Sequence, residues 1–279
     1  MKRIFAPFLA ALVLVSFKAN SAVPESAFFR ELPRNLTVTY GAPIVPAPLP
    51  IANLRLLVWN VHKGEDRRLP IDFGGLSQYA DISLFQEAVS DAFFTSAVAQ
   101  ANTLIGWTLA TSWELIESTY TGVATGSRVK PIHEDVIVSK VVEPITSTPK
   151  TMLVSEFNIE GRTDTLLVVN VHGINFVTTW EYRKQMRQLQ ERIVNHHGPL
   201  IVAGDFNTWN MERFKFVVSI LSPLGLNHVT TPPTGDFFSL DHIFVRGLTA
   251  TKVHNYNQVS SSDHRPLLVD FSFDAIPAQ

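Results

Sequence analysis

The sequence predicts an α/β fold in which two β-sheets pack face to face and helices cover their outer surfaces. From residue 51 onward, short apolar strands with Gly and Pro punctuation alternate with a few helices. Strands of continuous apolar character indicate burial on both faces. A tripeptide also recurs, because Asn60-Val61-His62 reappears as Asn170-Val171-His172, each near the end of an apolar strand. This echo predicts two similar units, roughly 51–140 and 151–275, with one unit in each sheet.

The strands are expected wherever an apolar run of strand length lies between turn residues. The first is Leu54–Asn60, with the sequence LRLLVWN, and a hairpin is expected around Glu160-Gly161. The other predicted strands, in order, are Asp81–Glu87, Trp107–Trp113, Tyr120–Ser127, Asp135–Ser139, Thr151–Asn158, Asp164–Asn170, Leu200–Gly204, Leu240–Val245, Thr249–Asn255 and Pro266–Phe273.

Three helices are predicted among these strands. The first spans Asp91–Ile105, where Asp91 suits a helix start. The strongest pattern is that of residues 178–197, because four apolar residues recur along it at helical spacing and form one stripe. They are Tyr182, Met186, Leu189 and Ile193. The third helix is expected over Met211–Leu221.

The first residues predict a secretory signal peptide over residues 1–22. Lys2 and Arg3 form a positive region, Ile4–Phe17 is largely apolar, and Ala19–Ala22 offers small residues for cleavage. The apolar stretch is shorter than the roughly 20 residues that span a bilayer, and an uncleaved anchor is the alternative. We therefore expect an exported protein, periplasmic or secreted, with no transmembrane span in the mature chain.

Composition narrows the range of partners. Residues 23–50 contain six prolines and predict an extended linker or a strap on the surface of the domain, which spans residues 51–279. Removal of residues 1–22 takes away three basic residues and no acidic ones, so the formal charge changes from −2 to −5. A strong basic footprint for nucleic acid is thereby excluded, although a bound cation supplies positive charge locally. The chain has no cysteine, so its core must stabilise it, and we expect a monomer.

Polar side chains stand repeatedly at the ends of the apolar strands. They are Asn60, Glu87, Asn170 with His172, Asp205 with Asn207, Asp241, and Asp263 with His264. Each alone suits a turn or a cap, but strand ends of a packed sheet meet at one rim, where such side chains converge. Asp205 and Asn207 are two residues apart, a spacing that aligns side chains along an extended chain. Carboxylate and amide oxygens favour a hard cation such as Mg²⁺, Mn²⁺ or Ca²⁺ over structural zinc.

An ordered set of motifs carries a family resemblance. The motifs are WNVHKG, DISLFQEA, TGVATGSR, VNVHGIN, VAGDFNTW, LDHIF and SSDHRPLLVDF. In order and spacing, from about residue 53 to 273, they resemble the endonuclease/exonuclease/phosphatase superfamily with the DNase I-like fold, and in particular a bacterial branch of it. The resemblance implies a four-layer α/β sandwich and metal-dependent cleavage of phosphodiester or phosphomonoester bonds.

The resemblance also implies roles for the polar residues. Asn60, Glu87 and Asp263 would surround the metal, Mg²⁺ first with Mn²⁺ or Ca²⁺ as alternatives. The chemistry would fall to His172, Asp205, Asn207, Asp241 and His264. Asp241 and His264 suit a carboxylate–histidine pair, in which the acid fixes the tautomer of the ring. His172 would donate to a phosphate oxygen, while Asp205 and Asn207 position the water or the phosphate. Either His264 or Asp205 would remove the proton from the water.

The substrate stays open at this point. Val89 stands where DNase-type members have a basic residue, and His172-Gly173-Ile174-Asn175 differs from the corresponding run of the abasic-site repair branch. We expect a phosphodiesterase, with DNA or RNA slightly favoured as substrate. The alternatives are a lipid or small-molecule phosphoesterase and, less favoured, a non-catalytic module that binds a phosphorylated ligand. His242, next to Asp241 on one strand, is expected to point away from the site, and the role of His62 is left open.

The signal peptide makes a first prediction. The mature protein should begin at Ala22 or Val23, because the small residues that suit cleavage follow the short apolar stretch directly. Intact-mass spectrometry of the protein exported from a bacterial host measures this start. A mature chain that still carries Met1 would contradict it.

Overall fold

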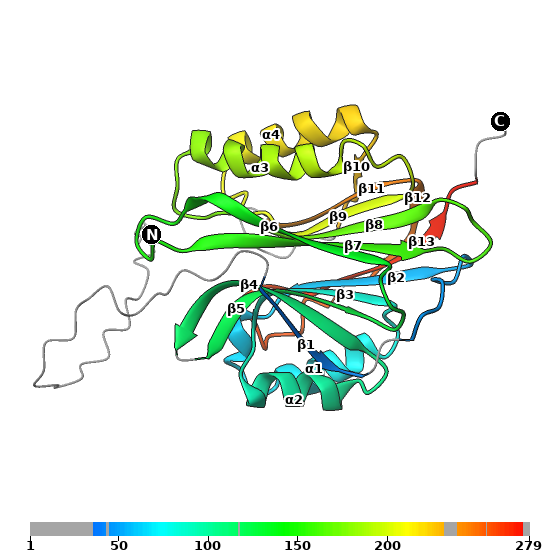
Figure 1. The fold of residues 1–279 in the computed structure, drawn as a ribbon, viewed down its shortest axis with the longest axis horizontal. Helices are drawn as coiled ribbons and strands as arrows, with labels where there is room; N and C mark the ends of the chain where they lie inside the picture. Colours follow the sequence, from blue (N-terminus) through cyan, green and yellow to red (C-terminus); the bar gives the residue numbers. More distant parts are fainter. Residues whose placement is uncertain (1–35, 43–44, 117, 232–238, 255, 276–279) are drawn as a thin grey trace, which may run out of the picture.

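Two mixed β-sheets pack face to face between two layers of helices in the computed structural model, which describes residues 36–42, 45–116, 118–231, 239–254 and 256–275 (Figure 1). Helices α1 (Leu69–Ser77) and α2 (Ala92–Ala101) cover one sheet, and α3 (Thr179–Ile193) and α4 (Met211–Leu221) cover the other. The predicted four-layer sandwich is confirmed. The predicted signal peptide, residues 1–22, lies outside the described residues. None of the helices in the described ranges is long and apolar enough to cross a membrane.

The first sheet has seven strands in the order β1-β4-β5-β3-β2-β13-β12. Their bounds are β1 Thr37–Gly41, β2 Leu54–Asn60, β3 Ile82–Val89, β4 Gly106–Ile116, β5 Thr119–Ser127, β12 Leu248–His254 and β13 Leu267–Phe273. Only β2 and β3 pair in parallel, and α1 connects them. Strand β1 lies inside the range predicted as linker or strap, and it pairs with β4 at the edge of the sheet.

The second sheet has six strands in the order β10-β11-β9-β8-β7-β6. Their bounds are β6 His133–Val142, β7 Pro149–Asn158, β8 Thr165–His172, β9 Leu200–Asp205, β10 Asn227–His228 and β11 Asp241–Arg246. Strands β8 and β9 pair in parallel, with α3 between them, so each sheet contains one β-α-β unit. The β11 strand runs antiparallel to β9 and therefore starts where β9 ends.

The core is divided into layers that follow this architecture. One cluster lies between the sheets and includes Leu56, Val168 and Ile201. Two further clusters lie under the helices, and in both the sheets supply apolar residues from their outer faces. Because both faces of the central strands are buried, continuous apolar runs are what the fold requires of them.

The prediction of one chain half in each sheet was wrong. Strand β6 falls in the first half but pairs with β7 in the second sheet, while β12 and β13 return to the first sheet beside β2. Helix boundaries also differ. Helix α2 ends at Ala101 and α3 at Ile193, earlier than predicted. Helix α1 was not predicted, because Pro70 and two glycines obscure its pattern, and the packing of its apolar residues on the sheet outweighs them.

A buried amide ties the two sheets together at an irregularity in β3. The register between β3 and β5 shifts after Phe85. Asn170 of β8 donates from Nδ2 to the carbonyl oxygens of Phe85 (3.1 Å) and Ala124 (3.0 Å). Its Oδ1 accepts from Nε2 of Gln86 at 2.7 Å. The amide of the second sheet thus binds backbone groups of the first sheet at the bulge, where a buried carbonyl without a partner would be costly.

The fold makes a second prediction at this position. Asn170→Leu keeps the approximate volume but leaves the two carbonyl groups without their donor, so the free energy of unfolding should fall by about 3 kcal/mol. Urea denaturation followed by circular dichroism measures the change. Asn195→Leu at an exposed position is the control, for which a change within about 0.5 kcal/mol is expected. Equal stability of the two variants would show that Asn170 does not hold the sheets together.

Candidate active site

The carboxyl ends of β8 and β9 place two predicted site residues side by side. His172 and Asp205 are register partners. Gly204 has a φ of 141°, and a Cβ there would lie 2.1 Å from the carbonyl oxygen of Val171. Only glycine allows this approach of the two strands. The chain then turns, with Asn207 in the left-handed region at a φ of 51°, and this turn brings its polar groups back to Asp205.

Asp205 is buried, and amide donors hold both of its oxygens. Its Oδ1 accepts from the backbone N–H of Asn207 at 2.8 Å. Its Oδ2 accepts from Nδ2 of Asn60 at 3.1 Å and faces Nδ2 of Asn207 at 3.4 Å. Burial raises the pKa of Asp205 to about 7, and the charge of Asp241 adds to this rise, while His264 opposes it. The carboxyl is therefore fixed in orientation and titrates near neutrality.

Asp241 and His264 form the predicted carboxylate–histidine pair. Nδ1 of His264 lies 2.7 Å from Oδ2 of Asp241. Trp59 donates to the backbone carbonyl of His264 at 3.0 Å, and Ser262 donates to the carbonyl of Asn60 at 2.7 Å, so the loop before β13 is fastened to the end of β2. Burial alone would lower the pKa of His264, but the charge and hydrogen bond of Asp241 outweigh it and raise the pKa to about 11. The ring is therefore a cation, and the buried Oδ1 of Asp241 has no hydrogen-bond partner among the described residues.

His172 completes the group from the end of β8. Its Nε2 lies 3.7 Å from Oδ2 of Asp205 and 4.0 Å from Oε1 of Glu87. Burial holds the pKa of His172 well below its ordinary value, and the positive charge of Lys150 acts in the same direction. This histidine is therefore neutral, unlike His264.

Glu87 sits at the bulge of β3 and has a cationic partner that the sequence did not predict. Nζ of Lys63 donates to Oε2 of Glu87 at 2.8 Å, and Nδ2 of Asn60 faces Oε1 at 3.5 Å. Burial acts to raise the pKa of Glu87, but the charges of Lys63 and Lys150 and the hydrogen bond from Lys63 hold it well below its usual range. Lys63 lies within the motif WNVHKG that carried the resemblance, so its closeness to Asn60 in sequence was the available signal. Lys150 had no such signal, because it is the second residue of β7 and lies in none of the motifs that carried the resemblance.

The three residues predicted around a metal are placed differently from one another. Glu87 supplies an anionic oxygen donor, which suits a hard divalent cation. The Oδ1 of Asn60 accepts from the backbone N–H of His62 at 3.1 Å, and the side chain of Asp263 is 60% exposed and lies 3.7 Å from His62. Within the described residues, no three His, Cys, Asp or Glu side chains are grouped closely enough to hold a metal ion. Glu87 thus fits a cation by its chemistry, whereas the carboxylate of Asp263 is largely exposed and faces His62.

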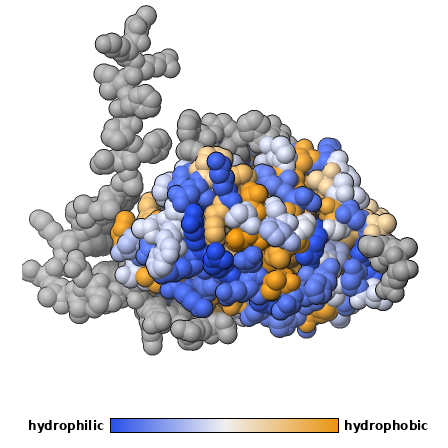
Figure 2. Space-filling model, turned by 90° about the horizontal axis from the view of Figure 1, so that it is seen from above, coloured by the Kyte–Doolittle hydropathy of each residue, from blue (hydrophilic) through white to orange (hydrophobic). Residues whose placement is uncertain are grey.

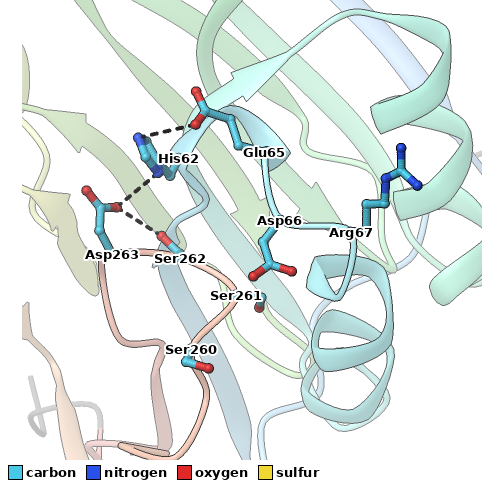
Figure 3. Close-up of a pocket in the computed structure, with 8 residues that line it drawn as sticks. All are labelled: His62, Glu65, Asp66, Arg67, Ser260, Ser261, Ser262 and Asp263. Carbon is cyan, nitrogen blue, oxygen red and sulfur yellow. Dashed lines mark hydrogen bonds and ion pairs between the residues drawn. The ribbon is translucent and has the colours of Figure 1, made fainter. Parts of the chain in front are cut away.

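A cavity of about 660 Å³ opens beside Asp263 (Figure 3). Figure 3 shows the ring of His62 between the carboxylates of Glu65 and Asp263, at 3.9 and 3.7 Å. The remaining lining is also polar and consists of Asp66, Arg67, Ser260, Ser261 and Ser262. His62, whose role the sequence left open, therefore lies between this cavity and the strand that ends at Asn60.

Exposed aromatic side chains lie on the loops that follow His172 and Asn207 and in the first turn of α3. Phe176, Trp180 and Trp209, here called the aromatic rim, are 61%, 65% and 43% exposed. The two loops are joined by the buried guanidinium of Arg213, which donates to the carbonyl oxygens of Ile174, Val177 and Asn207. Figure 2, which views the layer of α3 and α4, shows apolar patches separated by hydrophilic side chains.

His242 points away from the site, as the sequence predicted. It is buried, its Nε2 lies 2.7 Å from Oγ1 of Thr208, and its Nδ1 lies 3.1 Å from Nε2 of His228. Burial lowers the pKa of His242 to about 3. The alternation of side chains along β11 accounts for this, since it turns Asp241 toward His264 and His242 toward the helices.

Comparisons with known proteins agree with this geometry. The model of the Endonuclease/Exonuclease/phosphatase family matches residues 57–264. The UPF0294 protein of Vibrio campbellii is 31% identical over 285 residues, covering 96% of each chain. The human Nocturnin catalytic domain with bound sulfate is 23% identical, with a TM-score of 0.59, over 81% of this chain and 96% of that one. ANGEL2, a 2',3'-cyclic phosphatase solved with adenosine-2',3'-vanadate, is 14% identical, with a TM-score of 0.63, over 80% and 96%. The chain belongs to the endonuclease/exonuclease/phosphatase family.

Proposed function

We propose that this protein is an exported, metal-dependent phosphodiesterase. The observation that carries the proposal is the convergence of Asp205, His172 and the Asp241–His264 pair at one rim of the two sheets, with Glu87 beside them. A carboxyl that titrates near neutrality, a neutral histidine and a charged histidine are the groups that acid–base chemistry on a phosphoester requires. A divalent cation at Glu87 would neutralise charge on the phosphate.

Asp205 is the proposed proton acceptor. Because its pKa of about 7 lies near physiological pH, it is available as a base and still strong enough to take a proton from an attacking water. The amide donors of Asn60 and Asn207 keep both carboxylate oxygens in place. As the water oxygen bonds to phosphorus, its proton passes to Asp205 and the bond from phosphorus to the leaving oxygen breaks.

His264 and His172 are the proposed donors to the phosphate. With Nδ1 of His264 bound to Asp241, only its Nε2–H is left to donate to a phosphate oxygen that gathers negative charge. Preorganised donors of this kind stabilise the transition state without reorganising. The alternative assignment, with His264 as the base, requires a neutral ring, which the charge of Asp241 disfavours.

A nucleic-acid strand or nucleotide is the slightly favoured substrate. Hydroxyl and carboxylate side chains line the cavity beside Asp263, and such groups suit the hydroxyls of a sugar. The exposed rings of the aromatic rim offer faces on which bases stack. ANGEL2, which shares the fold, was solved with an adenosine derivative.

The exposed rim also favours a second candidate, a phosphodiesterase that acts on lipids. Trp180 is the most exposed of the three rim residues, and Nζ of Lys184 lies 3.4 Å from the centroid of its ring. Aromatic rings with adjacent cationic groups suit the interface of a bilayer. The two candidates share one chemistry and differ in what holds the rest of the substrate.

A substrate panel tests the function. Plasmid DNA, single-stranded RNA, bis-p-nitrophenyl phosphate and vesicles containing sphingomyelin or phosphoinositides should be incubated with the mature chain, with and without Mg²⁺. We expect Mg²⁺-dependent hydrolysis of bis-p-nitrophenyl phosphate and of a nucleic acid, and its loss in Asp205→Asn. Hydrolysis of vesicles alone would favour the lipid reading. Binding of phosphate with no hydrolysis of any substrate would replace both with a binding module.

The Asp241–His264 pair makes a prediction about rate and pH. Asp241→Asn removes the charge that keeps His264 protonated, so the rate at the optimum should fall by about 10²–10⁴-fold. The pKa of His264 drops in the variant, and the imidazolium is therefore lost at a lower pH as the pH rises. The pKa of Asp205 also drops, because Asp241 helps to raise it. Both limbs of the pH–rate profile should move to lower pH.

Asp263→Asn is the matched control for this measurement. Asp263 also raises the pKa of His264, but through charge alone, without a hydrogen bond to the ring. Its profile should move less than that of Asp241→Asn. A wild-type profile whose acid limb lies near pH 7 supports Asp205 as the base, whereas an acid limb near the pKa of His264 would assign the base to that histidine.

A further inference from the structure

We propose that Lys63 is a tethered cation that competes with a divalent metal ion for the carboxylate of Glu87. The inference rests on the proposed function, because it takes Glu87 as the metal ligand. It adds a residue outside the predicted metal and catalytic groups and assigns it a role in setting the affinity for the metal.

The contact itself is direct and partly shielded from water. Nζ of Lys63 lies 2.8 Å from Oε2 of Glu87, and their side chains are 33% and 22% exposed. The other carboxylate oxygen, Oε1, faces nitrogen atoms of Asn60 and His172 at 3.5 and 4.0 Å. Both oxygens of Glu87 therefore face nitrogen groups, and the charged group, the ammonium of Lys63, faces Oε2.

The backbone is strained at both partners, which indicates that the chain is built to bring them together. Lys63 has a φ of 55° and Glu87 a φ of 54°, and neither is glycine. Residues in such conformations persist only where the surroundings fix them, and they cluster at functional sites. The Lys63 turn is fixed by Gly64, whose N–H donates to the carbonyl of Val61 at 2.8 Å. A Cβ on Gly64 would lie 2.5 Å from the ring of Phe94.

The backbone beside Glu87, the second partner of the ion pair, is also fixed by hydrogen bonds. The N–H of Val61 donates to the carbonyl of Gln86 at 3.0 Å, which links the chain before the turn to the residue before Glu87. Asn170 holds the bulge on its other side through Phe85 and Ala124. The position of the ion pair thus follows from buried backbone contacts and not from two mobile side chains meeting by chance.

An ammonium group and a divalent ion both bind to the carboxylate of Glu87. Each needs a carboxylate oxygen, and Glu87 offers a half-buried carboxylate at this point of the rim. The ammonium stabilises Glu87 when no ion is bound, because a half-buried carboxylate without a partner is costly. Lysine ends in a compact charge on a flexible stem, so it is able to leave when a metal ion arrives. The exchange should lower the apparent affinity for the ion.

Titration calorimetry with Mn²⁺ tests the competition without any need for turnover. The mature wild-type chain is compared with Lys63→Met, which removes the ammonium and keeps a side chain of similar length. We expect Mn²⁺ to bind about tenfold more tightly to the variant, the range of one charge-assisted hydrogen bond.

Lys150→Met is the matched control. Lys150 also lowers the pKa of Glu87 through its charge, but its Nζ lies 3.5 Å from Glu143. Its removal changes the electric field at Glu87 and frees no carboxylate oxygen there, so we expect a change of less than about threefold. Lys63→Gly provides a second variant, because glycine suits the positive φ at this position, and it should bind Mn²⁺ as tightly as Lys63→Met does.

The outcomes separate this inference from the proposed function. Tighter binding in both Lys63 variants, beyond that of Lys150→Met, supports the competition. Unchanged affinity in both, with binding abolished in Glu87→Gln, overturns it and leaves the metal site at Glu87 intact. If Glu87→Gln binds Mn²⁺ with the same affinity as wild type, Glu87 is not the metal ligand, and the proposed competition is overturned as well.

Discussion

The bulge in β3, held by the amide of Asn170, is the constraint on which the site depends. Along a regular strand Phe85 faces the helices, Gln86 faces the second sheet, and Glu87 would face the helices again. The register shift and the positive φ of Glu87 break this alternation. The carboxylate consequently turns to the rim, where Asn60 and Lys63 meet it. One buried polar contact between the sheets therefore determines where the first anionic group of the site points.

The pairing of each carboxylate with a nitrogen group is the second feature that organises the site. Three carboxylates, those of Glu87, Asp205 and Asp241, are buried or nearly so, and each has a nitrogen group against it. Burial and these partners shift the groups in different directions, so that Glu87 stays ionised, Asp205 titrates near neutrality and His264 stays charged. Environments that separate the pKa values of neighbouring groups are typical of hydrolytic sites, and they agree with membership of a family of phosphoester hydrolases.

The sequence predicts the layers of the fold and the members of the site better than their connections. Apolar runs mark the strands because both faces of each sheet are buried, but no local pattern shows that β13 returns to pair with β2. Asp205 and Asn207 were expected to align along an extended chain. They meet because the chain turns, with Asn207 in the left-handed region. Lys63 was overlooked for the same reason, since a left-handed turn cannot be inferred from hydrophobic periodicity.

The left-handed residues have a consequence for how such a chain changes under selection. Five of the seven non-glycine residues with positive φ in the described part, namely His62, Lys63, Glu87, Phe176 and Asn207, lie at or beside the site. At each of them glycine would relieve backbone strain. Selection for thermal stability alone would accordingly replace these residues early, while leaving the sheets and helices unchanged. Variants obtained in that way would keep the architecture of the family and lose the features by which its chemistry is recognised.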